Sequence, residues 1–278
     1  MVVALALAVP CRAAAQLERP VDRETFLAEA ATTAERYADR REAMADGFRR
    51  IGPEFPGMGV HWVQTSRIVS SDLRGDRPAV LCYAEIDGNA TLVGLAYTLP
   101  LAPGESPPSE PFGVEVWHDH SGQVTEESLL LNHSSSMTAS DDGFRLSMVH
   151  VWSPLANPAG VLAQNNWTLP YLRAGLEPPE PPAPGAARGL SLGSGGIAYY
   201  RELLHWAAEL DTSDRAIIDS LLEERAAEVD AWVALNRDRW GEADLAEVEA
   251  VWVALWDDLE RSLDADLYER IHPLRAGT

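Results

Sequence analysis

The feature that most constrains the fold is the alternation of hydrophobic and polar residues in several runs between positions 58 and 155. A period of two is typical of β-strands, because successive side chains point to opposite sides of a sheet. The alternation predicts five strands, at Val60–Ile68, Ala79–Ile86, Thr91–Leu99, Phe112–His120 and Phe144–Trp152. Between the second and third runs, Asp87-Gly88-Asn89 predicts a tight hairpin turn. We therefore expect a mostly antiparallel sheet or a small barrel.

Helical patterns flank this region on both sides. Hydrophobic spacing predicts one amphipathic helix from Val21 to Arg50, with Phe26, Tyr37 and Met44 on its apolar face. After the strands, helical spacing returns in three or four segments, around Leu203–Leu210, Ile217–Trp232, Leu245–Leu259 and Leu263–Ile271, and Asp211-Thr212-Ser213-Asp214 predicts a capped helix start. The sequence thus predicts an α+β fold: an N-terminal helix, a β-rich part, and an acidic α-helical bundle with a core of Trp206, Trp232, Trp252 and Trp256.

The clearest boundary in the chain lies at residues 177–196, EPPEPPAPGAARGLSLGSGG. Segments rich in Pro, Gly, Ser and Ala supply little apolar surface for a core, so this composition predicts a linker. The linker would separate a helix plus β-rich domain at residues 16–176 from an acidic helical domain at residues 197–278.

Residues 1–15 have the features of a secretory signal. An apolar stretch from Val2 to Val9 is followed by Ala13-Ala14-Ala15, a small-residue run of the kind that signal peptidases cleave. The stretch is too short to span a bilayer, and no later segment is long and apolar enough, so we expect no transmembrane segment in the mature chain. Cleavage would leave Cys82 as the only thiol and no internal disulfide. The predicted location is periplasmic or extracellular.

Composition excludes several classes of protein. All 22 basic residues are Arg and none is Lys, and 43 acidic residues give a net charge of −21. Such a field repels nucleic acid. Without Lys there is no pyridoxal phosphate Schiff base and no phosphate-loop lysine, and no NAD or nucleotide fingerprint is present. The acidic helical part has two interpretations, a solvated surface or a docking surface for a basic protein partner.

Histidines concentrate in the predicted strands, where five of the seven lie: His61, His118, His120, His133 and His150. His118 and His120 share one face of a strand, so they can offer two imidazole nitrogens to one cation. A third ligand such as His150 would complete a catalytic zinc site, and Met148 or Met137 would suit copper. The alternative is that the pair lies on a polar loop edge and that His150 is a hydrogen-bonded core residue.

A zinc ion with an open coordination position lowers the pKa of bound water to about 7 and supports hydrolysis of a small ester or amide. Glu115 points away from the histidine pair, which leaves Glu126 and Asp119 as candidate catalytic bases. Two other motifs are weaker. The G-x-S-x-G motif at residues 189–193 lacks a preceding strand, and the Glu-x-x-His motif at residues 202–205 lies on a polar helix face.

Tryptophans in the same region offer a different function. Trp62, Trp117 and Trp152, together with Trp167, could line an aromatic pocket for a small-molecule ligand. Three hypotheses therefore remain: an exported zinc or copper protein with a possible hydrolase activity, a non-catalytic ligand-binding domain, and an envelope interaction protein that uses its acidic helical tail.

A set of short motifs lies between residues 30 and 170: Tyr37-Ala38-Asp39-Arg40, Ala45-Asp46-Gly47-Phe48, Gly57-Met58-Gly59-Val60-His61-Trp62-Val63, Pro78-Ala79-Val80-Leu81-Cys82-Tyr83, Leu92-Val93-Gly94-Leu95-Ala96-Tyr97, His150-Val151-Trp152 and Asn157-Pro158-Ala159-Gly160. Together these motifs resemble a family of uncharacterised, mostly exported bacterial proteins. The resemblance implies export and a domain boundary, and it names no reaction. The chain departs from the family at Ala96, where the resemblance implies a Glu. A family site that used this carboxylate would lack it here.

Overall fold

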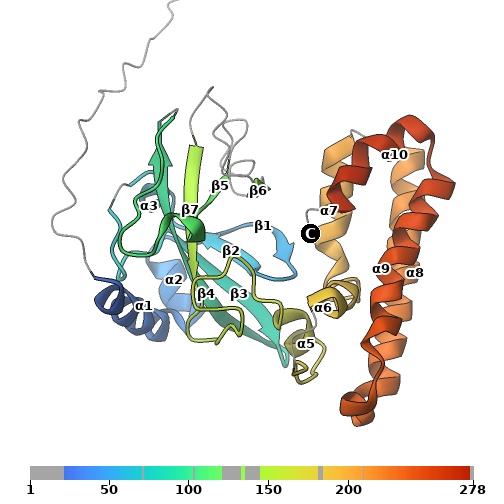
Figure 1. Cartoon of the computed structure of the whole chain (residues 1–278), viewed down its shortest axis with the longest axis horizontal. Coiled ribbons are helices and arrows are strands. Elements are labelled where there is room, and N and C mark those ends of the chain that lie inside the picture. The colour runs from blue at the N-terminus through green and yellow to red at the C-terminus, as the bar shows by residue number, and fades with distance from the viewer. Residues whose placement is uncertain are drawn as a thin grey trace, which may run out of the picture.

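The computed structural model describes residues 22–70, 72–102, 104–120, 133–134, 145–180, 184–208 and 210–275. The predicted signal at residues 1–15 lies outside this range. Two regions stand side by side in Figure 1. One is a curved β-sheet with the N-terminal helices packed against it, and the other is a group of helices formed by the C-terminal part of the chain. The predicted α+β class, with a helix and an antiparallel sheet before a helical region, is confirmed.

The sheet has seven strands, β1 (Arg49–Phe55), β2 (Gly59–Val63), β3 (Val80–Ile86), β4 (Asn89–Leu101), β5 (His118–His120), β6 (His133–Ser134) and β7 (Arg145–Val151). Their order across the sheet is β1-β2-β3-β4-β7-β5-β6, and every neighbouring pair is antiparallel. The last strand in sequence therefore lies inside the sheet, between β4 and β5.

The predicted hairpin joins β3 to β4. Asp87 and Gly88 both have positive φ, 52° and 72°, and Ile86 pairs with Asn89 across the turn. Two adjacent residues with positive φ are the requirement of the type I′ turn, whose twist matches that of the flanking strands. The hairpin turn predicted at Asp87-Gly88-Asn89 is therefore confirmed.

Two of the predicted strands are shorter in the structure. The run Val60–Ile68 ends at Val63, because Gln64 caps a short helix, α3 (Thr65–Ile68), by accepting a hydrogen bond from the backbone of Arg67. The run Phe112–His120 is extended only in β5, and Val114–Val116 form a 3₁₀ turn, η1. Gly113 precedes this turn with φ of 94°, a conformation that breaks an extended strand.

The single N-terminal helix predicted from Val21 to Arg50 is wrong. The structure has two helices, α1 (Arg23–Tyr37) and α2 (Arg40–Ala45), and the chain then enters β1. Asp39 divides them, because its side chain accepts a hydrogen bond from the backbone N–H of Arg41 and caps α2. Met44, predicted on the apolar face, is 57% exposed.

Each face of the sheet has its own core. Helix α1 covers one face, where the ring of Phe26 lies 4.7 Å from those of both Tyr97 and Phe112. We call this the helix-covered face. The opposite face buries a second cluster: Ile51, Val63, Val80, Cys82, Ala84, Val93, Ala96, Leu146, Met148, Trp152 and Leu169. Alternation along the strands separates the two sets, as a period of two requires.

The C-terminal helices are α5 (Leu169–Arg173), α6 (Pro184–Leu190), α7 (Ile197–Ala208), α8 (Thr212–Asn236), α9 (Leu245–Ser262) and α10 (Ala265–Ile271), with 3₁₀ turns η2 (Arg237–Glu242) and η3 (His272–Arg275). Asp211 caps α8 by accepting from the backbone N–H groups of Ser213 and Asp214, as predicted. Trp232, Trp252 and Trp256 are buried in the helical core, while the Trp206 side chain lies outside the described part.

The predicted linker is wrong for its second half, which belongs to the helical core. Ala186, Ala187 and Leu190 of α6, together with Leu192, are buried there. The absence of a side chain at Gly189 lets α6 approach α9, since a Cβ there would lie 2.2 Å from the carbonyl oxygen of Val248. Small residues that suggest a flexible linker by composition are used here for close helix packing.

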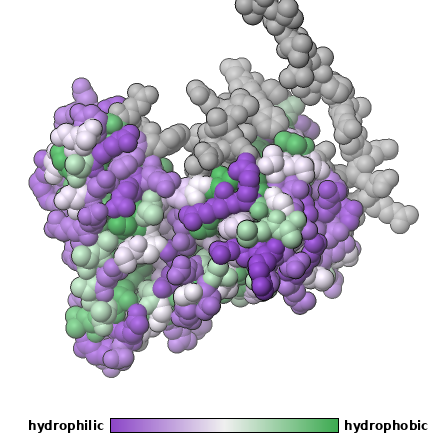
Figure 2. Space-filling model, turned by 180° about the vertical axis from the view of Figure 1, so that it is seen from behind, coloured by the Kyte–Doolittle hydropathy of each residue, from purple (hydrophilic) through white to green (hydrophobic). Residues whose placement is uncertain are grey.

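The helical region contacts the sheet through its first strand. Arg173 forms an ion pair of 3.1 Å with Glu54 of β1, and the ring of Phe55 lies 4.8 Å from that of Tyr199 on α7. Hydrophilic residues cover most of the surface seen in Figure 2, and hydrophobic ones show only in small groups. None of the described helices is long and apolar enough to cross a membrane.

Candidate functional site

Four of the five predicted metal ligands lie on the face opposite α1, which we call the histidine face. Strand pairing places them there: His61 pairs with Cys82, His118 with Met148, and His150 with Ala96. Cys82, Met148 and Ala96 belong to the buried cluster of that face. His120 follows His118 by two residues and shares its side of β5. Strands β2, β5 and β7, which are far apart in sequence, thus contribute imidazoles to one surface.

The four imidazoles form a buried row. His61, His118, His120 and His150 are between 1% and 5% exposed. The ring of His118 lies 5.1 Å from that of His150, with 26° between the planes, and 5.0 Å from that of His120. The ring of His61 lies 6.3 Å from that of His150, in an edge-on arrangement. Each imidazole therefore has at least one other as a direct neighbour.

Aromatic rings flank this row. Phe55 meets the His61 ring edge-on, at 5.0 Å, and Trp152 stacks on His150 at 5.9 Å with only 20° between the planes. The indole N–H of Trp152 donates to the carbonyl of Ala163 at 2.6 Å, which fixes the ring in its orientation. The apolar neighbours exclude water from this side of the row.

The remaining predicted residues on this side are only partly described. The backbone of His133 pairs with that of His120, so β6 extends the sheet beyond β5. The side chain of His133 lies outside the described part. Glu126 and Met137 also lie outside it. Among the side chains that the structure describes, no three from His, Cys, Asp or Glu are arranged to hold one ion as they stand.

The structure does not support Asp119 as a catalytic base for this row. Asp119 pairs with Ser147 across β5 and β7, so it points to the helix-covered face, as alternation predicts. There its carboxylate forms a buried ion pair with Arg145, whose guanidinium also donates to the carbonyl of Glu105. A carboxylate held in this way on the far side of the sheet serves the packing of β5 against β7.

The predicted tryptophan pocket does not form, because its members lie in different cores. Trp62 and Trp117 pack with the helix-covered face, and Trp152 lies on the histidine face. Trp167 packs against the helical core, where its ring meets that of Tyr171. Trp62 follows His61 and Trp117 precedes His118, so the same alternation that gathers the histidines turns these indoles away.

The two weaker motifs have structural roles. The hydroxyl of Ser191, at the centre of the G-x-S-x-G motif, is buried and donates to the carbonyl of Ala187 at 2.8 Å. In the Glu-x-x-His motif, His205 contacts the carboxylate of Asp219 on α8 at 3.0 Å, and Glu202 is exposed. The Ser191 hydroxyl bonds to the last turn of α6, and the His205 contact joins α7 to α8.

Sequence reasoning missed two residues of the histidine face. Cys82 lies across from His61, and burial raises the pKa of its thiol to about 12, so it is a packing residue in this state. Ala96, where the family resemblance implies a Glu, lies directly opposite His150 and is fully buried. The alternation within each strand predicts their faces, but finding them beside histidines requires the strand order.

No family model matches the chain, and comparison with curated proteins and with solved structures found no match. The site must therefore be interpreted from its own chemistry. Imidazole nitrogen is a ligand for zinc and copper, whereas Mg²⁺ and Ca²⁺ prefer oxygen. A buried row made of one side-chain type, flanked by fixed aromatic rings, can bind a transition metal ion when its rings turn toward a common point.

Proposed function

We propose that the histidine face binds one divalent transition metal ion, zinc or copper, through His118 and His150, with His120 or His61 as a further ligand. The observation that carries the proposal is the mutual contact of these imidazoles, supplied by three strands of one sheet. Backbone hydrogen bonds form the ladder whatever side chains the strands carry, so strand pairing does not require histidine at these four positions.

Ring spacing supports this choice of ligands. Two imidazoles that share a tetrahedral zinc ion through bonds of about 2.0 Å have ring centroids about 5 Å apart. The centroids of His118 and His120 are 5.0 Å apart, and those of His118 and His150 are 5.1 Å apart. The rings are already at ligand spacing, and binding requires them to turn about their side-chain torsions rather than the sheet to move.

Catalysis is a separate step of the hypothesis. Zinc with an open position would supply an activated water, but an acid–base group must also lie on the same side. Of the two candidate bases, Asp119 lies on the far side of the sheet. We therefore propose metal binding as the function, and hydrolase activity stays a prediction that depends on Glu126.

Elemental analysis of protein purified without chelator or affinity tag is the direct test. We expect about one zinc or copper per chain, and loss of the metal in His118→Ala/His150→Ala. His272→Ala is the matched control, because it removes an exposed imidazole of the helical region and should leave the metal content unchanged.

A second measurement keeps the test valid if the double variant fails to fold. Cobalt added to the wild-type chain should give visible absorption bands typical of tetrahedral nitrogen ligation. Zinc should displace the cobalt and abolish these bands. Wild-type protein that contains no metal, and takes up neither zinc, copper nor cobalt, would contradict the proposal.

A further inference from the structure

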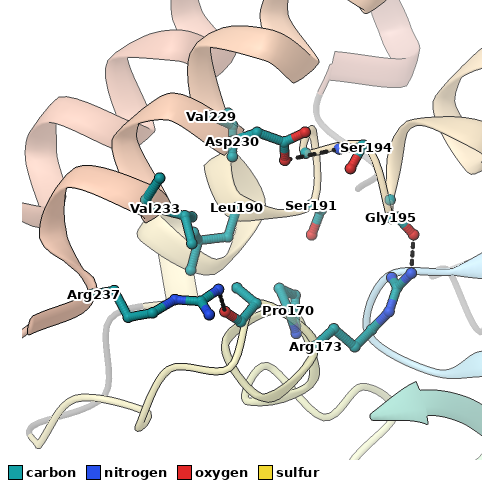
Figure 3. Close-up of a pocket in the computed structure, with 14 residues that line it drawn as sticks. Pro170, Arg173, Leu190, Ser191, Ser194, Gly195, Val229, Asp230, Val233 and Arg237 are labelled. Atoms are coloured by element: carbon teal, nitrogen blue, oxygen red, sulfur yellow. Dashed lines mark hydrogen bonds between the residues drawn. The ribbon is translucent and has the colours of Figure 1, made fainter. Parts of the chain in front are cut away.

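A cavity at the base of the helical region has a chemistry unlike that of the histidine face. It measures about 620 Å³ and lies between α5, the loop that follows α6, and α8 (Figure 3). Its lining includes the apolar residues Leu190, Val229 and Val233, and Arg237 and Arg173 enter it from opposite ends. A volume of this order suits a small organic molecule.

The two arginines are positioned by backbone carbonyls. Arg237 donates to the carbonyl of Ala174 at 3.2 Å, and Arg173 donates to that of Gly195 while pairing with Glu54. A guanidinium carries five N–H donors, so these contacts leave further donors on each side chain. Arg237 makes no ion pair with any residue in the described ranges.

The glycine-rich loop beside the arginines does not cradle phosphate. Most of its amides are already used: Ser194 N–H donates to Asp230, Gly193 N–H to Leu190, and Ile197 N–H to Gly193. Its glycines allow close packing, since a Cβ on Gly196 would lie 1.9 Å from the carbonyl oxygen of Ser191. A phosphate site of the helix-terminus type needs such amides free.

Neighbouring carboxylates limit the charge that a ligand can carry. Asp230 lines the cavity itself, and an adjoining cavity of about 410 Å³ shares Arg173 and Arg237 but is also lined by Glu54, Glu85 and Asp87. A dianion would meet repulsion from these groups. A single negative charge would be held by the Arg237 guanidinium, since arginine matches a carboxylate in planar geometry.

We propose that this cavity binds a small monocarboxylic acid, with its carboxylate on Arg237 and its hydrocarbon chain against Leu190 and Val233. The site lies in the helical region and is independent of the proposed metal site. Because Arg173, at the other end of the cavity, pairs with Glu54 of β1, the ligand would be held where the helices meet the sheet.

Calorimetric titration of the full chain with sodium hexanoate tests this proposal. We expect saturable binding to the wild type and at least about tenfold weaker binding of hexanamide, which has the same shape without the charge. Arg237→Gln should also weaken hexanoate binding about tenfold. Arg239→Gln is the matched control, because it removes an equal charge from the same 3₁₀ turn without lining the cavity.

Arg237→Lys guards against a folding defect in the glutamine variant. It keeps the positive charge but loses the planar pair of donors, so it should bind hexanoate less tightly than the wild type and more tightly than Arg237→Gln. The proposal is overturned if hexanoate does not saturate the wild type, if hexanamide binds equally, or if the Arg237 and Arg239 variants behave alike. Displacement of hexanoate by an equal concentration of inorganic phosphate would also overturn it.

Discussion

The two faces of the sheet use their buried polar side chains in different ways. On the helix-covered face, the hydroxyl of Tyr83 donates to the carbonyl of Tyr37 at 2.6 Å, and that of Tyr97 donates to Gly75 at 2.7 Å. These contacts hold the N-terminal helix and a loop on the sheet. On the histidine face, imidazoles contact one another and aromatic rings. Alternation within the same strands thus places the residues that hold the helix on one face and the candidate binding residues on the other.

The largest expected effect is on the helix-covered face. Phe26→Ala should lower the free energy of unfolding by about 3–5 kcal/mol, because it removes a fully buried ring that packs on Tyr97 and Phe112. Urea denaturation measures the loss, and Met44→Ala, at an exposed position of α2, is the control. Metal uptake per folded chain should not change. A variant that stays stable but loses metal would break the distinction between the faces.

Asp119→Ala should cost about 3 kcal/mol of unfolding free energy, since it leaves the Arg145 guanidinium buried without its carboxylate. Replacing both residues in Asp119→Ala/Arg145→Met should recover part of the loss. The comparison is made by chemical denaturation alongside elemental analysis. If Asp119 served the metal site instead, the single variant would lose metal while keeping its stability.

Tyr97→Phe should have a smaller effect, about 1 kcal/mol, because one buried hydrogen bond to Gly75 is lost while the ring remains. Tyr83→Phe removes the equivalent bond to Tyr37 and should cost a similar amount. The shift in the midpoint of urea denaturation, at an unchanged m value, measures the loss of unfolding free energy in both variants. An unchanged midpoint in both variants would mean that these hydroxyls do not hold the helix on the sheet.

The smallest effect concerns pH at the edge of the helix-covered face. Hydrogen bonds from the Arg41 side chain and backbone lower the pKa of the exposed Asp39 carboxyl to about 2 from 3.8. A lowered folded-state pKa gives stability that is present above the unfolded value and lost as the pH falls from about 4 through 2. Asp39→Asn should therefore reduce the loss of thermal stability over this range. Identical pH profiles for both proteins would contradict this assignment.

Sequence patterns predicted what depends on neighbouring residues. The alternation located β3, β4 and β7, the turn residues located their hairpin, and the Asp211 cap located the start of α8. Alternation along the strand also predicts that Asp119 lies on the opposite side from His118, as the structure has it, and the same reasoning separates the tryptophans. Features that depend on distant partners were missed, among them the burial of α6 against α9 and the pairing of Asp119 with Arg145.

In the candidate site, too, the sequence predicts what depends on neighbouring residues and misses what depends on distant ones. The sequence named all four histidines of the row, because residue type and periodicity are local properties. It did not pair β2 with β3 or β4 with β7, and without these pairings Cys82 and Ala96 could not be recognised as neighbours of His61 and His150. Strand order is set by packing between segments far apart in the chain, which no local pattern records.

The position of β7 in the sheet also has a consequence for the order of folding. Strands β1 to β4 follow one another in both sequence and space, so they can pair as the chain emerges. Strand β5 has no neighbour among them and must wait for β7, which closes the gap between β4 and β5. His118 and His120 therefore join His61 only in the last pairing step. Contact between the imidazoles of His118 and His150 would mark a sheet in which β5 has paired with β7.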